Sequence, residues 1–536
     1  MTNAPAKSFG VVRGAAWAAA LAASVWGAGA LAQEGASPAG GSDAPAWPAT
    51  GSFRAAKHVQ PTRRDMAMAY MRFEEVLALN PPAAERVAEV NRAFDGLTED
   101  FFMQRTGEAV RRLHELTHSL TDDGPMTGDE LAVHSLRGRI DPESYCPLPD
   151  LPAPVIRVQT MYDVPESGAG VRTVRIELRE QNATRSIVGI DLAAEFGPGD
   201  AVDATLALPG DLVLRTGRYE VVARMEGVEP RVLCPFWVMP AMTDALGAEL
   251  EDLLEVVDMA NDRLDREVQI SKKRASLLTS TPSEDRSAQF LADPMLLAGE
   301  VRHEYQTMDD ARSPFRYKGG EYWRVLDIGS NRGVPMVVYA PGSVVMKRRP
   351  APLVVCLHGA GGDESMFMRG YGAGLIRTLA EQRGFIAVSV STLLLGSEAK
   401  YLSRLVDDMA VDYDIDRSRV YLVGHSLGGI AASGLAWGAR EVVAGAVCIA
   451  GYRDTPADPA PAATLVIAGE LDRIFPPARL ADAEKVAEAG GPVETRVIKD
   501  YGHTLVVARA LPEAIAWLLE KRNERAAAVG PRPESP

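Results

Sequence analysis

The spacing of hydrophobic and polar positions changes along this chain, and each spacing predicts a different kind of element. Over residues 61–122 apolar side chains recur every three to four positions, which is typical of helices packed along one face. Over residues 151–240 apolar and polar positions alternate, as in Val171–Leu178, which is typical of strands with one buried face. We therefore expect a helical domain over 61–150, followed by a β-sandwich.

Apolar residues between 243 and 279 follow a heptad-like spacing. This spacing predicts one long helix that packs on another helix, and the N-terminal helices are the expected partner. Asp293 followed by Pro294 predicts the start of a second helix, because Asp caps helix N-termini and Pro is tolerated in the first turn. We expect residues 241–312 to form a long helical connector.

From residue 313 onward, short apolar runs alternate with helical patterns. Strands of a parallel sheet that is buried on both faces have this near-continuous apolar character, with crossover helices between them. The fold class expected for 313–523 is therefore α/β, with a mostly parallel sheet, and residues 524–536 are expected to form a disordered tail. The predicted strands are 353–357, 385–390, 420–423, 444–449 and 464–468, after an initial hairpin of 322–328 and 334–339.

Residues 1–32 have the composition of a secretory signal peptide. Lys7 and Arg13 give a weakly basic start, an Ala-rich apolar stretch follows, and Ala30-Leu31-Ala32 fits the small-x-small cleavage pattern. We expect cleavage there, a flexible linker over 33–60, and localisation of the exported protein to the periplasm or outside the cell. No later stretch offers about twenty uninterrupted apolar residues, so no membrane span is expected in the mature chain.

The charge balance of the chain is acidic, with 57 Lys and Arg against 72 Asp and Glu, and a net charge of −15. Nucleic-acid binding depends on clustered Lys and Arg, so this balance argues against a nucleic-acid partner. Four cysteines in an exported protein permit disulfides without requiring them. Cys146 and Cys234 are candidates for a pair, whereas Cys356 and Cys448 lie in apolar strand-like runs and are expected to be buried thiols.

The richest chemical signal is the pentapeptide Gly424-His425-Ser426-Leu427-Gly428. An apolar, β-branched run precedes it, and a run of small residues with helical character follows it. Between a strand and a helix, G-x-S-x-G forms a sharp turn that exposes the serine hydroxyl as a nucleophile. The glycines on either side of the serine let strand and helix approach closely. We therefore expect Ser426 to be a nucleophile.

A serine hydroxyl needs a base that takes its proton, and the base needs an acid that orients it. Along chains with this turn the order is Ser, then Asp or Glu, then His. His503 is the only histidine downstream of Ser426, and Asp472 follows a predicted strand. We predict His503 as the base and Asp472 as the acid, with Glu470 and Asp500 as lesser candidates for the acid.

The negative oxygen that forms when a serine attacks a carbonyl needs N–H donors held in place. The backbone amide of Leu427, directly after the serine, is one expected donor. The second is expected from Ala360, or else from Gly361, in the glycine-rich loop after the third predicted strand. His358 in that loop and His425 beside the serine are expected to brace or pack rather than to act as bases.

Several motifs in residues 315–523 together resemble a known family. They are His358-Gly359-x-Gly361-Gly362, Tyr413-x-Ile415-Asp416-x-x-Arg419-Val420-Tyr421, the Ser426 turn, Gly469-x-x-Asp472 and Gly502-His503. The region resembles the α/β-hydrolase superfamily, most closely its compact bacterial serine esterases of the feruloyl-esterase and polyhydroxybutyrate-depolymerase type, and the related hydrolase domain of prolyl-oligopeptidase-type peptidases. The resemblance implies Ser426 as nucleophile, Asp472 as orienting acid and His503 as base, with no cofactor and no metal.

Two departures from that family bear on the substrate. The segment between Gly451 and Thr464 is too short for a large lid, and the upstream region lacks the propeller that screens substrates in the oligopeptidases. Both favour an esterase acting on a small-molecule or polymer ester. A serine peptidase of the prolyl-oligopeptidase type remains the main alternative, and a hydrolase-like binding protein without activity is a lesser one. The partner of the upstream domains is left open.

A competing motif, His114-Glu115-Leu116-Thr117-His118, has the H-E-x-x-H pattern of zinc peptidases. Catalytic zinc sites need a third protein ligand, and the two positions where known peptidase patterns would place it are Gly124 and Gly138. We therefore treat a zinc metallopeptidase as a minor alternative. His134 or Glu143 would still be available to complete a non-catalytic metal site.

Overall fold

A computed structural model describes residues 55–525, apart from 56, 123, 148–152, 210–211, 261, 280–292, 330–332, 455 and 457–459. The predicted signal peptide, most of the predicted linker and nearly all of the predicted tail lie outside the described residues. Among the residues described, no helix combines the length and the apolar character needed to cross a bilayer.

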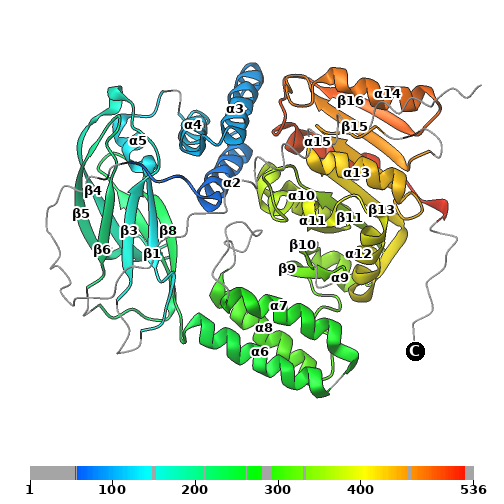
Figure 1. The fold of residues 1–536 in the computed structure, drawn as a ribbon, viewed down its shortest axis with the longest axis horizontal. Helices are drawn as coiled ribbons and strands as arrows, with labels where there is room; N and C mark the ends of the chain where they lie inside the picture. Colours follow the sequence, from blue (N-terminus) through cyan, green and yellow to red (C-terminus); the bar gives the residue numbers. More distant parts are fainter. Residues whose placement is uncertain are drawn as a thin grey trace, which may run out of the picture. The chain divides into compact units, whose positions relative to one another are not determined.

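The described chain divides into two compact units (Figure 1). One unit contains residues 82–103 together with everything from Phe315 onward, and the other contains the described residues up to Pro81 and from Gln104 to Pro314. Residues 82–103, which the sequence analysis assigned to a separate helical domain, thus share a unit with the predicted α/β region.

An eight-stranded sheet forms the centre of the unit that contains the C-terminal residues. Its strand order is β16-β15-β14-β13-β11-β12-β10-β9. The neighbouring pairs from β12 to β16 run parallel, whereas β9 and β10 form an antiparallel hairpin whose β10 pairs with β12. The strands are β9 (Gly320–Asp327), β10 (Gly333–Ala340), β11 (Ala351–Leu357), β12 (Ile386–Val390), β13 (Ile415–His425), β14 (Gly445–Ile449), β15 (Ala463–Gly469) and β16 (Val493–Ile498). The expected mostly parallel sheet is confirmed, and the predicted strands agree with it to within a few residues at most of their ends.

The central strands of this sheet are buried along their whole length, because helices cover both faces of a mostly parallel sheet. Helices α10 and α15 share one apolar cluster with the alternate positions Tyr421 and Val423 of β13. Helices α12 and α13 contact the same strand and each other. The helices of this unit are α3 (Val87–Phe102), α9 (Gly342–Lys347), α10 (Tyr371–Arg383), α11 (Thr392–Leu395), α12 (Ala399–Asp412), α13 (Leu427–Gly438), α14 (Ala481–Glu488) and α15 (Val506–Leu519).

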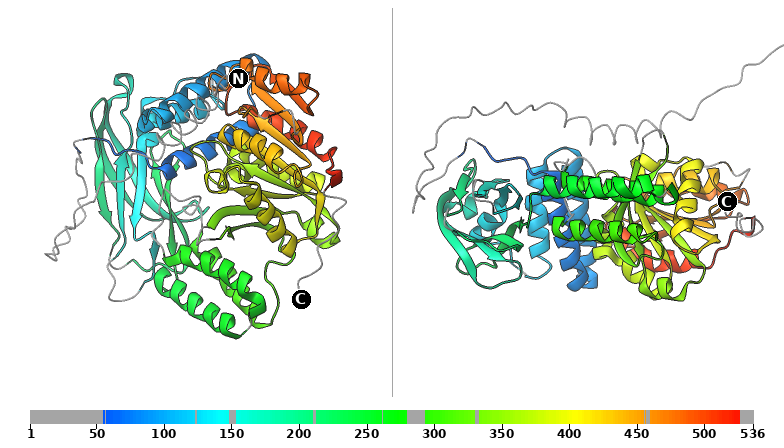
Figure 2. Two further views of the ribbon diagram at one scale, coloured as in Figure 1. Left: turned by 45° about the vertical axis from the view of Figure 1, so that its right-hand side comes forward. Right: turned by 90° about the horizontal axis from the view of Figure 1, so that it is seen from below.

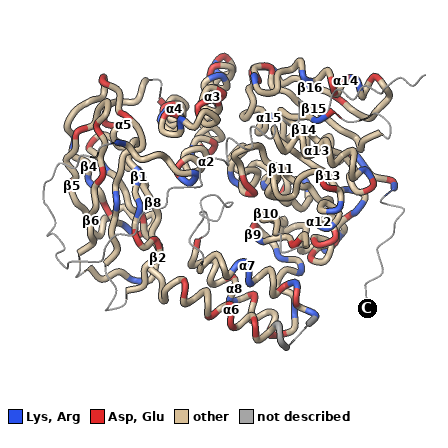
Figure 3. The backbone as a smooth tube through the Cα atoms, viewed as in Figure 1, with Lys and Arg blue, Asp and Glu red and all other residues tan. Residues whose placement is uncertain are grey.

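Charged positions of both signs are interspersed along the elements of both units (Figure 3). Two fully buried charged groups form an ion pair: Arg324 of β9 donates to Asp412 of α12 over 2.5 Å, and Arg324 also pairs with Asp408. A buried guanidinium is stable only with such partners, so this cluster ties the edge strand β9 to α12.

The other unit contains two sheets that share one core. Its three-stranded sheet has the order β1-β3-β6, and its five-stranded sheet has the order β2-β8-β7-β4-β5. Inward residues of both sheets, such as Val158, Leu206, Ile176 and Phe236, belong to one apolar cluster, which is the arrangement of a sandwich. The strands are β1 (Leu136–Asp141), β2 (Ser144–Tyr145), β3 (Val155–Thr160), β4 (Gly170–Glu180), β5 (Ser186–Phe196), β6 (Asp203–Ala207), β7 (Gly217–Arg224) and β8 (Arg231–Val238).

Strands β1 and β2 come from residues that the sequence analysis assigned to the helical region. Leu136–Asp141 is only six residues long, and its pairing with β3 is antiparallel over its whole length. So short a segment carries little periodic signal of its own, and the partner strand decides its conformation. The helices before it are α2 (Arg63–Leu79), α4 (Thr106–His118) and α5 (Gly128–Ser135).

The long helix predicted from 243 to 279 is divided in two. Helix α6 (Thr243–Ala260) and helix α7 (Asp265–Thr279) pack on each other and on α8 (Pro294–Asp309), as Figures 1 and 2 show. Leu250, Val268 and Val301, one from each helix, lie in the same apolar cluster. The heptad-like spacing therefore reflects packing among α6, α7 and α8. The prediction that this segment packs on the N-terminal helices is wrong for α6, whose helix partners are α7 and α8. Asp293 caps α8 as predicted, accepting hydrogen bonds from two backbone amides.

All four cysteines are buried free thiols, so Cys146 and Cys234 are not paired. Both lie in the sandwich unit. Burial raises the pKa of the Cys234, Cys356 and Cys448 thiols and keeps these groups protonated.

Candidate active site

Ser426 occupies the sharp turn between β13 and α13. Its backbone has φ 52° and ψ −114°, a conformation that L-residues rarely adopt. The turn makes Ser426 the residue immediately before the helix, yet its side chain does not cap the helix N-terminus. The hydroxyl is therefore free to interact with residues from other loops.

Glycines around the turn allow three backbone segments to approach closely. A Cβ atom on Gly424 would lie 2.0 Å from the carbonyl oxygen of Gly428, and a Cβ on Gly428 would lie 1.8 Å from that of Leu357 at the end of β11. A Cβ on Gly451 would lie 2.1 Å from the carbonyl oxygen of Ser426. Each of these distances is far below van der Waals contact, so only glycine fits at these positions.

Replacing Gly428 by alanine is expected to destabilise the fold by more than about 3 kcal/mol, because the new methyl group would have to displace backbone atoms of β11. Urea unfolding of the purified variant measures this. Gly438 near the end of the same helix is the matched control, since a Cβ there meets nothing within 4 Å. Gly438→Ala is expected to be neutral or to stabilise by up to about 1 kcal/mol. Equal stability of the two variants would contradict the packing argument.

Three side chains from separate loops form a continuous hydrogen-bonded chain. His503 Nε2 lies 3.0 Å from Ser426 Oγ, and His503 Nδ1 lies 2.8 Å from Asp472 Oδ2. Ser426 follows β13, Asp472 follows β15, and His503 follows β16. The carboxyl ends of these parallel strands lie at one edge of the sheet, which is why residues far apart in sequence meet there. Asp472 and His503 are each only 3 % exposed.

The Asp472 carboxylate is fixed by the loop in which it lies. Its Oδ1 atom accepts hydrogen bonds from the backbone amides of Ile474 and Phe475, both at 2.8 Å, which leaves Oδ2 for His503. The two lesser candidates for the acid make other contacts, and the Asp500 carboxylate lies 3.8 Å from the Lys499 ammonium. Glu470 is exposed and accepts a hydrogen bond from the backbone amide of Asp500. The structure therefore brings Asp472, and not Glu470, to the imidazole.

His425 holds the backbone of His503 rather than facing the serine hydroxyl. Its Nε2 donates to the carbonyl oxygen of His503 at 3.0 Å, and its Nδ1 accepts from the Tyr371 hydroxyl at 2.7 Å. Burial, and secondarily the neighbouring His503, lowers the pKa of His425 well below its usual value, so the ring stays neutral in this role. Tyr371 is a supporting residue that the sequence motifs did not reveal.

The glycine-rich loop turns directly beside the serine. A Cβ on Gly359 would lie 3.2 Å from Ser426 Cβ, so the loop and the nucleophile are in contact. The Gly362 amide donates to the Gly359 carbonyl at 3.2 Å, and Gly361 has φ +80°, as the third residue of a type II turn requires. His358 is buried and braces the loop, with Nδ1 donating to the Gly359 carbonyl and Nε2 accepting from the Thr392 amide.

Leu427 and Ala360 supply the amides predicted to stabilise an oxyanion. Leu427 is the first residue of α13, where the backbone N–H has no partner within the helix and the helix dipole favours negative charge. Ala360 is the second residue of the turn that contacts Ser426. Both segments predicted to supply the donors are thus next to Ser426, one in sequence and one by contact.

Helix α3 contributes contacts that the sequence motifs did not predict. Asp95 accepts a hydrogen bond from the backbone amide of His503, and Asn91 accepts one from that of Gly502. The donors and acceptors are about 410 positions apart in the chain, as the separation of 408 between Asp95 and His503 illustrates. A single sequence holds no local signal for such a contact.

The H-E-x-x-H residues lie in the sandwich unit and serve packing. His114 is buried, and its Nδ1 lies 2.9 Å from the Tyr162 hydroxyl. Burial lowers the pKa of His114 well below its usual value and that of His134 to about 3. His118 lies 3.7 Å from Glu130, and Glu143 accepts from Arg64. In the part of the chain that the structure describes, no group of three or more ligating side chains is arranged to hold a metal.

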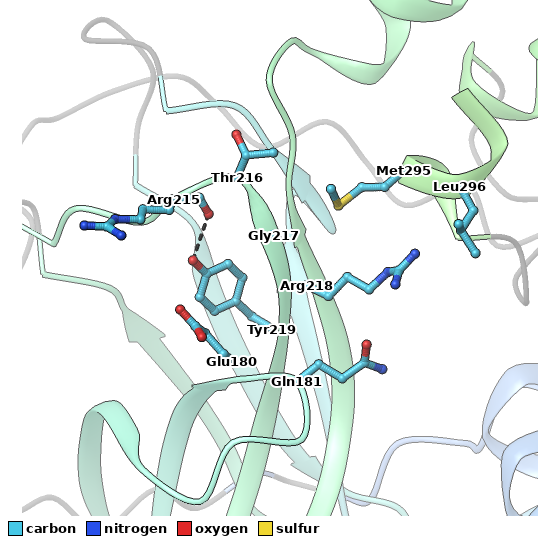
Figure 4. A pocket seen from close by; sticks show the side chains of 9 residues that line it. All are labelled: Glu180, Gln181, Arg215, Thr216, Gly217, Arg218, Tyr219, Met295 and Leu296. Atoms are coloured by element: carbon cyan, nitrogen blue, oxygen red, sulfur yellow. Dashed lines mark hydrogen bonds between the residues drawn. The ribbon is translucent and has the colours of Figure 1, made fainter. Parts of the chain in front are cut away.

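A pocket of about 590 Å³ lies in the sandwich unit (Figure 4). It contains none of the three residues of the hydrogen-bonded chain. The Tyr219 hydroxyl in its wall donates to the Arg215 carbonyl at 2.8 Å, and Arg218 pairs with Asp293 at the start of α8. The pocket is lined by Glu180, Gln181, Arg215, Thr216, Gly217, Arg218, Tyr219, Met295 and Leu296.

Known proteins similar to this chain match its C-terminal part. Residues 354–482 match the model of the Alpha/beta hydrolase family. Similar solved structures include an S-formylglutathione hydrolase from Staphylococcus aureus, with 16 % identity over 38 % of this chain and 98 % of that chain, and a TM-score of 0.32. Another is a feruloyl esterase module from Clostridium thermocellum, with 14 % identity over 38 % of this chain and 89 % of that chain, and a TM-score of 0.32. A third is a thermophilic esterase from the planctomycete Thermogutta terrifontis, with 15 % identity over 38 % of this chain and 92 % of that chain, and a TM-score of 0.31.

No curated protein sequence matches the chain. The family match covers the strands on both sides of the Ser426 turn, and the strand order and the serine turn between β13 and α13 agree with the expected α/β-hydrolase fold. The C-terminal region of this chain therefore has an α/β-hydrolase fold, and residues 354–482 within it match the model of the Alpha/beta hydrolase family.

Proposed function

We propose that this protein is an exported serine hydrolase that cleaves carboxylic esters through an acyl-enzyme. The observation that carries the proposal is the hydrogen-bonded chain from Asp472 through His503 to Ser426, at a strained turn that begins a helix. Nucleophile, base and orienting acid are the three groups that acyl transfer by a serine requires.

In the proposed reaction, His503 Nε2 takes the proton of Ser426 Oγ as this oxygen attacks the ester carbonyl. The N–H groups of Leu427 and Ala360 stabilise the negative oxygen that forms. The imidazolium then gives its proton to the departing alcohol, which leaves an ester between Ser426 and the acyl group. A water molecule, deprotonated by His503, releases the acid and restores the serine hydroxyl.

An ester is proposed in preference to a peptide on the resemblance to compact esterases. The upstream unit also has the two sheets of a sandwich rather than the repeated blades of a propeller that would restrict a peptide substrate. Export rests on the signal-like composition of the first 32 residues. The sandwich unit would then bring the enzyme to a substrate or surface outside the cytoplasm.

Labelling with a fluorescent fluorophosphonate tests the proposal, because this probe reacts with activated serines. The native protein is expected to be labelled and Ser426→Ala is not. Parallel assays with p-nitrophenyl esters of short acids and with peptide p-nitroanilides separate esterase from peptidase. Absence of labelling in the native protein would favour an inactive binding protein, and faster turnover of the anilides would favour the peptidase. Mass spectrometry of protein secreted by a bacterial host tests export, with a mature N-terminus expected near Gln33.

Treatment with EDTA is expected to leave ester hydrolysis unchanged within about twofold, since every step of the proposed reaction uses only protein groups. Initial rates before and after dialysis against the chelator measure this effect. Loss of activity that added zinc restores would instead support the metallopeptidase alternative at His114 and His118.

A further inference from the structure

Helix α3 packs against the loop that carries His503, within the same compact unit. The backbone amide of His503 donates to both carboxylate oxygens of Asp95, at 3.0 and 3.2 Å. The preceding amide, of Gly502, donates to Asn91 Oδ1 at 2.9 Å. Asn91 and Asp95 are four residues apart and so lie on one face of the helix, which receives two consecutive N–H groups of the loop.

Both partners on α3 are themselves held in place. Asn91 is 3 % exposed, and its Nδ2 donates to the Val87 carbonyl one turn earlier, which fixes Oδ1 toward the loop. Asp95 fits because residue 502 is glycine: a Cβ there would lie 2.4 to 2.6 Å from the carboxyl atoms of Asp95. The helix and the loop are therefore matched at atomic contact.

The same helix reaches two other loops of the site. A Cβ on Gly361, in the oxyanion turn, would lie 2.7 Å from the ring of Phe101, so this ring packs directly on the turn. Glu99 lies 3.8 Å from Arg473, the residue after Asp472. One helix thus contacts the glycine-rich loop, the Asp472 loop and the His503 loop, although its sequence lies more than two hundred residues upstream of the hydrolase strands.

Residue 95 is an acid, although a neutral side chain could also accept the hydrogen bond from the His503 amide. Burial raises its pKa to about 6, and the nearby Asp472 charge adds to this, while the His503 amide bond, the His503 ring and Arg473 oppose it. At neutral pH the carboxylate is charged and close to the imidazole that must become positive during the reaction. A negative charge at that place stabilises an imidazolium.

We propose that Asp95 is a positioning residue of the catalytic site, and that α3 acts with His425 to clamp the backbone of His503 from both sides. His425 binds the His503 carbonyl, and Asp95 binds its amide. This inference rests on the proposed function, because it assigns Asp95 a role through the base His503.

Kinetics of Asp95 variants on a p-nitrophenyl ester test the proposal. Asp95→Ala is expected to lower kcat about 10- to 100-fold with little change in KM, because a misplaced base slows chemistry more than binding. Asp95→Asn keeps an acceptor for the amide, so its loss of kcat is smaller, and the acidic limb of its pH–activity profile moves to lower pH. Glu89→Gln removes an exposed acid from the same helix and serves as the matched control, with unchanged kinetics expected.

A double-mutant cycle with Gly502 distinguishes this contact from general disruption. Gly502→Ala is expected to lower kcat to a similar degree, because its methyl group expels the Asp95 carboxylate. In the Asp95→Ala background the same substitution is expected to cost at most about twofold more, since the atoms it would strike are gone. Additive losses, or a folded Asp95→Ala protein with native kcat, would overturn the inference. Absence of fluorophosphonate labelling in the native protein would instead overturn the proposed function.

Thermal unfolding gives a readout that needs no activity. The folded-state pKa of Asp95 lies above its ordinary value of 3.8, so between about pH 4 and 6 the folded state binds more protons and the native protein loses stability as pH rises. Asp95→Asn lacks this group. Its Tm is therefore expected to exceed that of the native protein by several degrees at pH 8 and by little at pH 4. A lower Tm than native at pH 8 together with a native kcat would show that Asp95 only stabilises the fold and would contradict the proposal.

Discussion

Ser426→Ala is expected to lower kcat for ester hydrolysis by at least about 10⁴-fold, the largest effect of any single substitution in this chain. The Oγ atom that alanine lacks is the one that His503 Nε2 contacts at 3.0 Å, and it is the atom that would bond to the acyl group. Because the residual rate depends on the oxyanion donors and on substrate binding alone, KM is expected to change far less than kcat.

The fold is expected to tolerate this substitution within about 1 kcal/mol, since the Ser426 side chain does not cap α13. Steady-state kinetics with a short-chain p-nitrophenyl ester and urea unfolding measure the two quantities. Ser397→Ala, at an exposed serine of the same unit, is the matched control and should retain both turnover and fluorophosphonate labelling. Turnover in Ser426→Ala at a rate near that of the native protein would remove the serine from the reaction.

Asp472→Asn is expected to lower kcat by about 10³- to 10⁴-fold without a large change in structure. Oδ1 accepts from the backbone amides of Ile474 and Phe475, so the asparagine oxygen would stay there and its NH₂ group would face His503. An NH₂ group donates a hydrogen bond, so His503 Nδ1 would have to accept it. The ring proton would then lie on Nε2, so this nitrogen could not accept the proton of Ser426.

The tautomer argument is specific to Asp472, which makes a matched comparison possible. Glu470→Gln changes an acid two residues earlier that binds the Asp500 amide from an exposed position. We expect it to keep kcat within about threefold, because removing a surface charge away from the reacting groups has little effect. The kinetics of the two variants, measured side by side, decide between the acids that the sequence left open. A loss in Glu470→Gln equal to that in Asp472→Asn would contradict the assignment.

Helix α3 supplies contacts to the site that the sequence analysis did not anticipate. The segment between β14 and β15 is short, so the sequence indicated no room for a lid there. Residues 87–102 nevertheless contact the site, because Phe101 packs on the turn of residues 359–362 and Asp95 binds the His503 loop. Part of the support for the candidate active site therefore comes from a helix outside the family-matched region.

The sequence by itself determined the elements whose signals are local. The apolar runs of the central strands, the Gly-x-Ser-x-Gly turn and the order of Ser426, Asp472 and His503 each depend on a few neighbouring residues. A buried parallel strand requires a continuous apolar run, and a close approach of backbones requires glycine. Both requirements are visible in short stretches of sequence, so the sheet and the three residues at its edge could be predicted.

Only the tertiary structure decided the contacts between distant segments. Whether Cys146 and Cys234 pair, whether 243–279 is one helix or two, and which helix contacts the His503 loop all depend on partners far away in the chain. Asp95 and His503 are 408 positions apart, and the local sequence of neither segment indicates that the two are in contact. Hydrogen bonds and packing at that separation are selected by the whole fold, and for that reason the support of His503 by α3 became visible only in three dimensions.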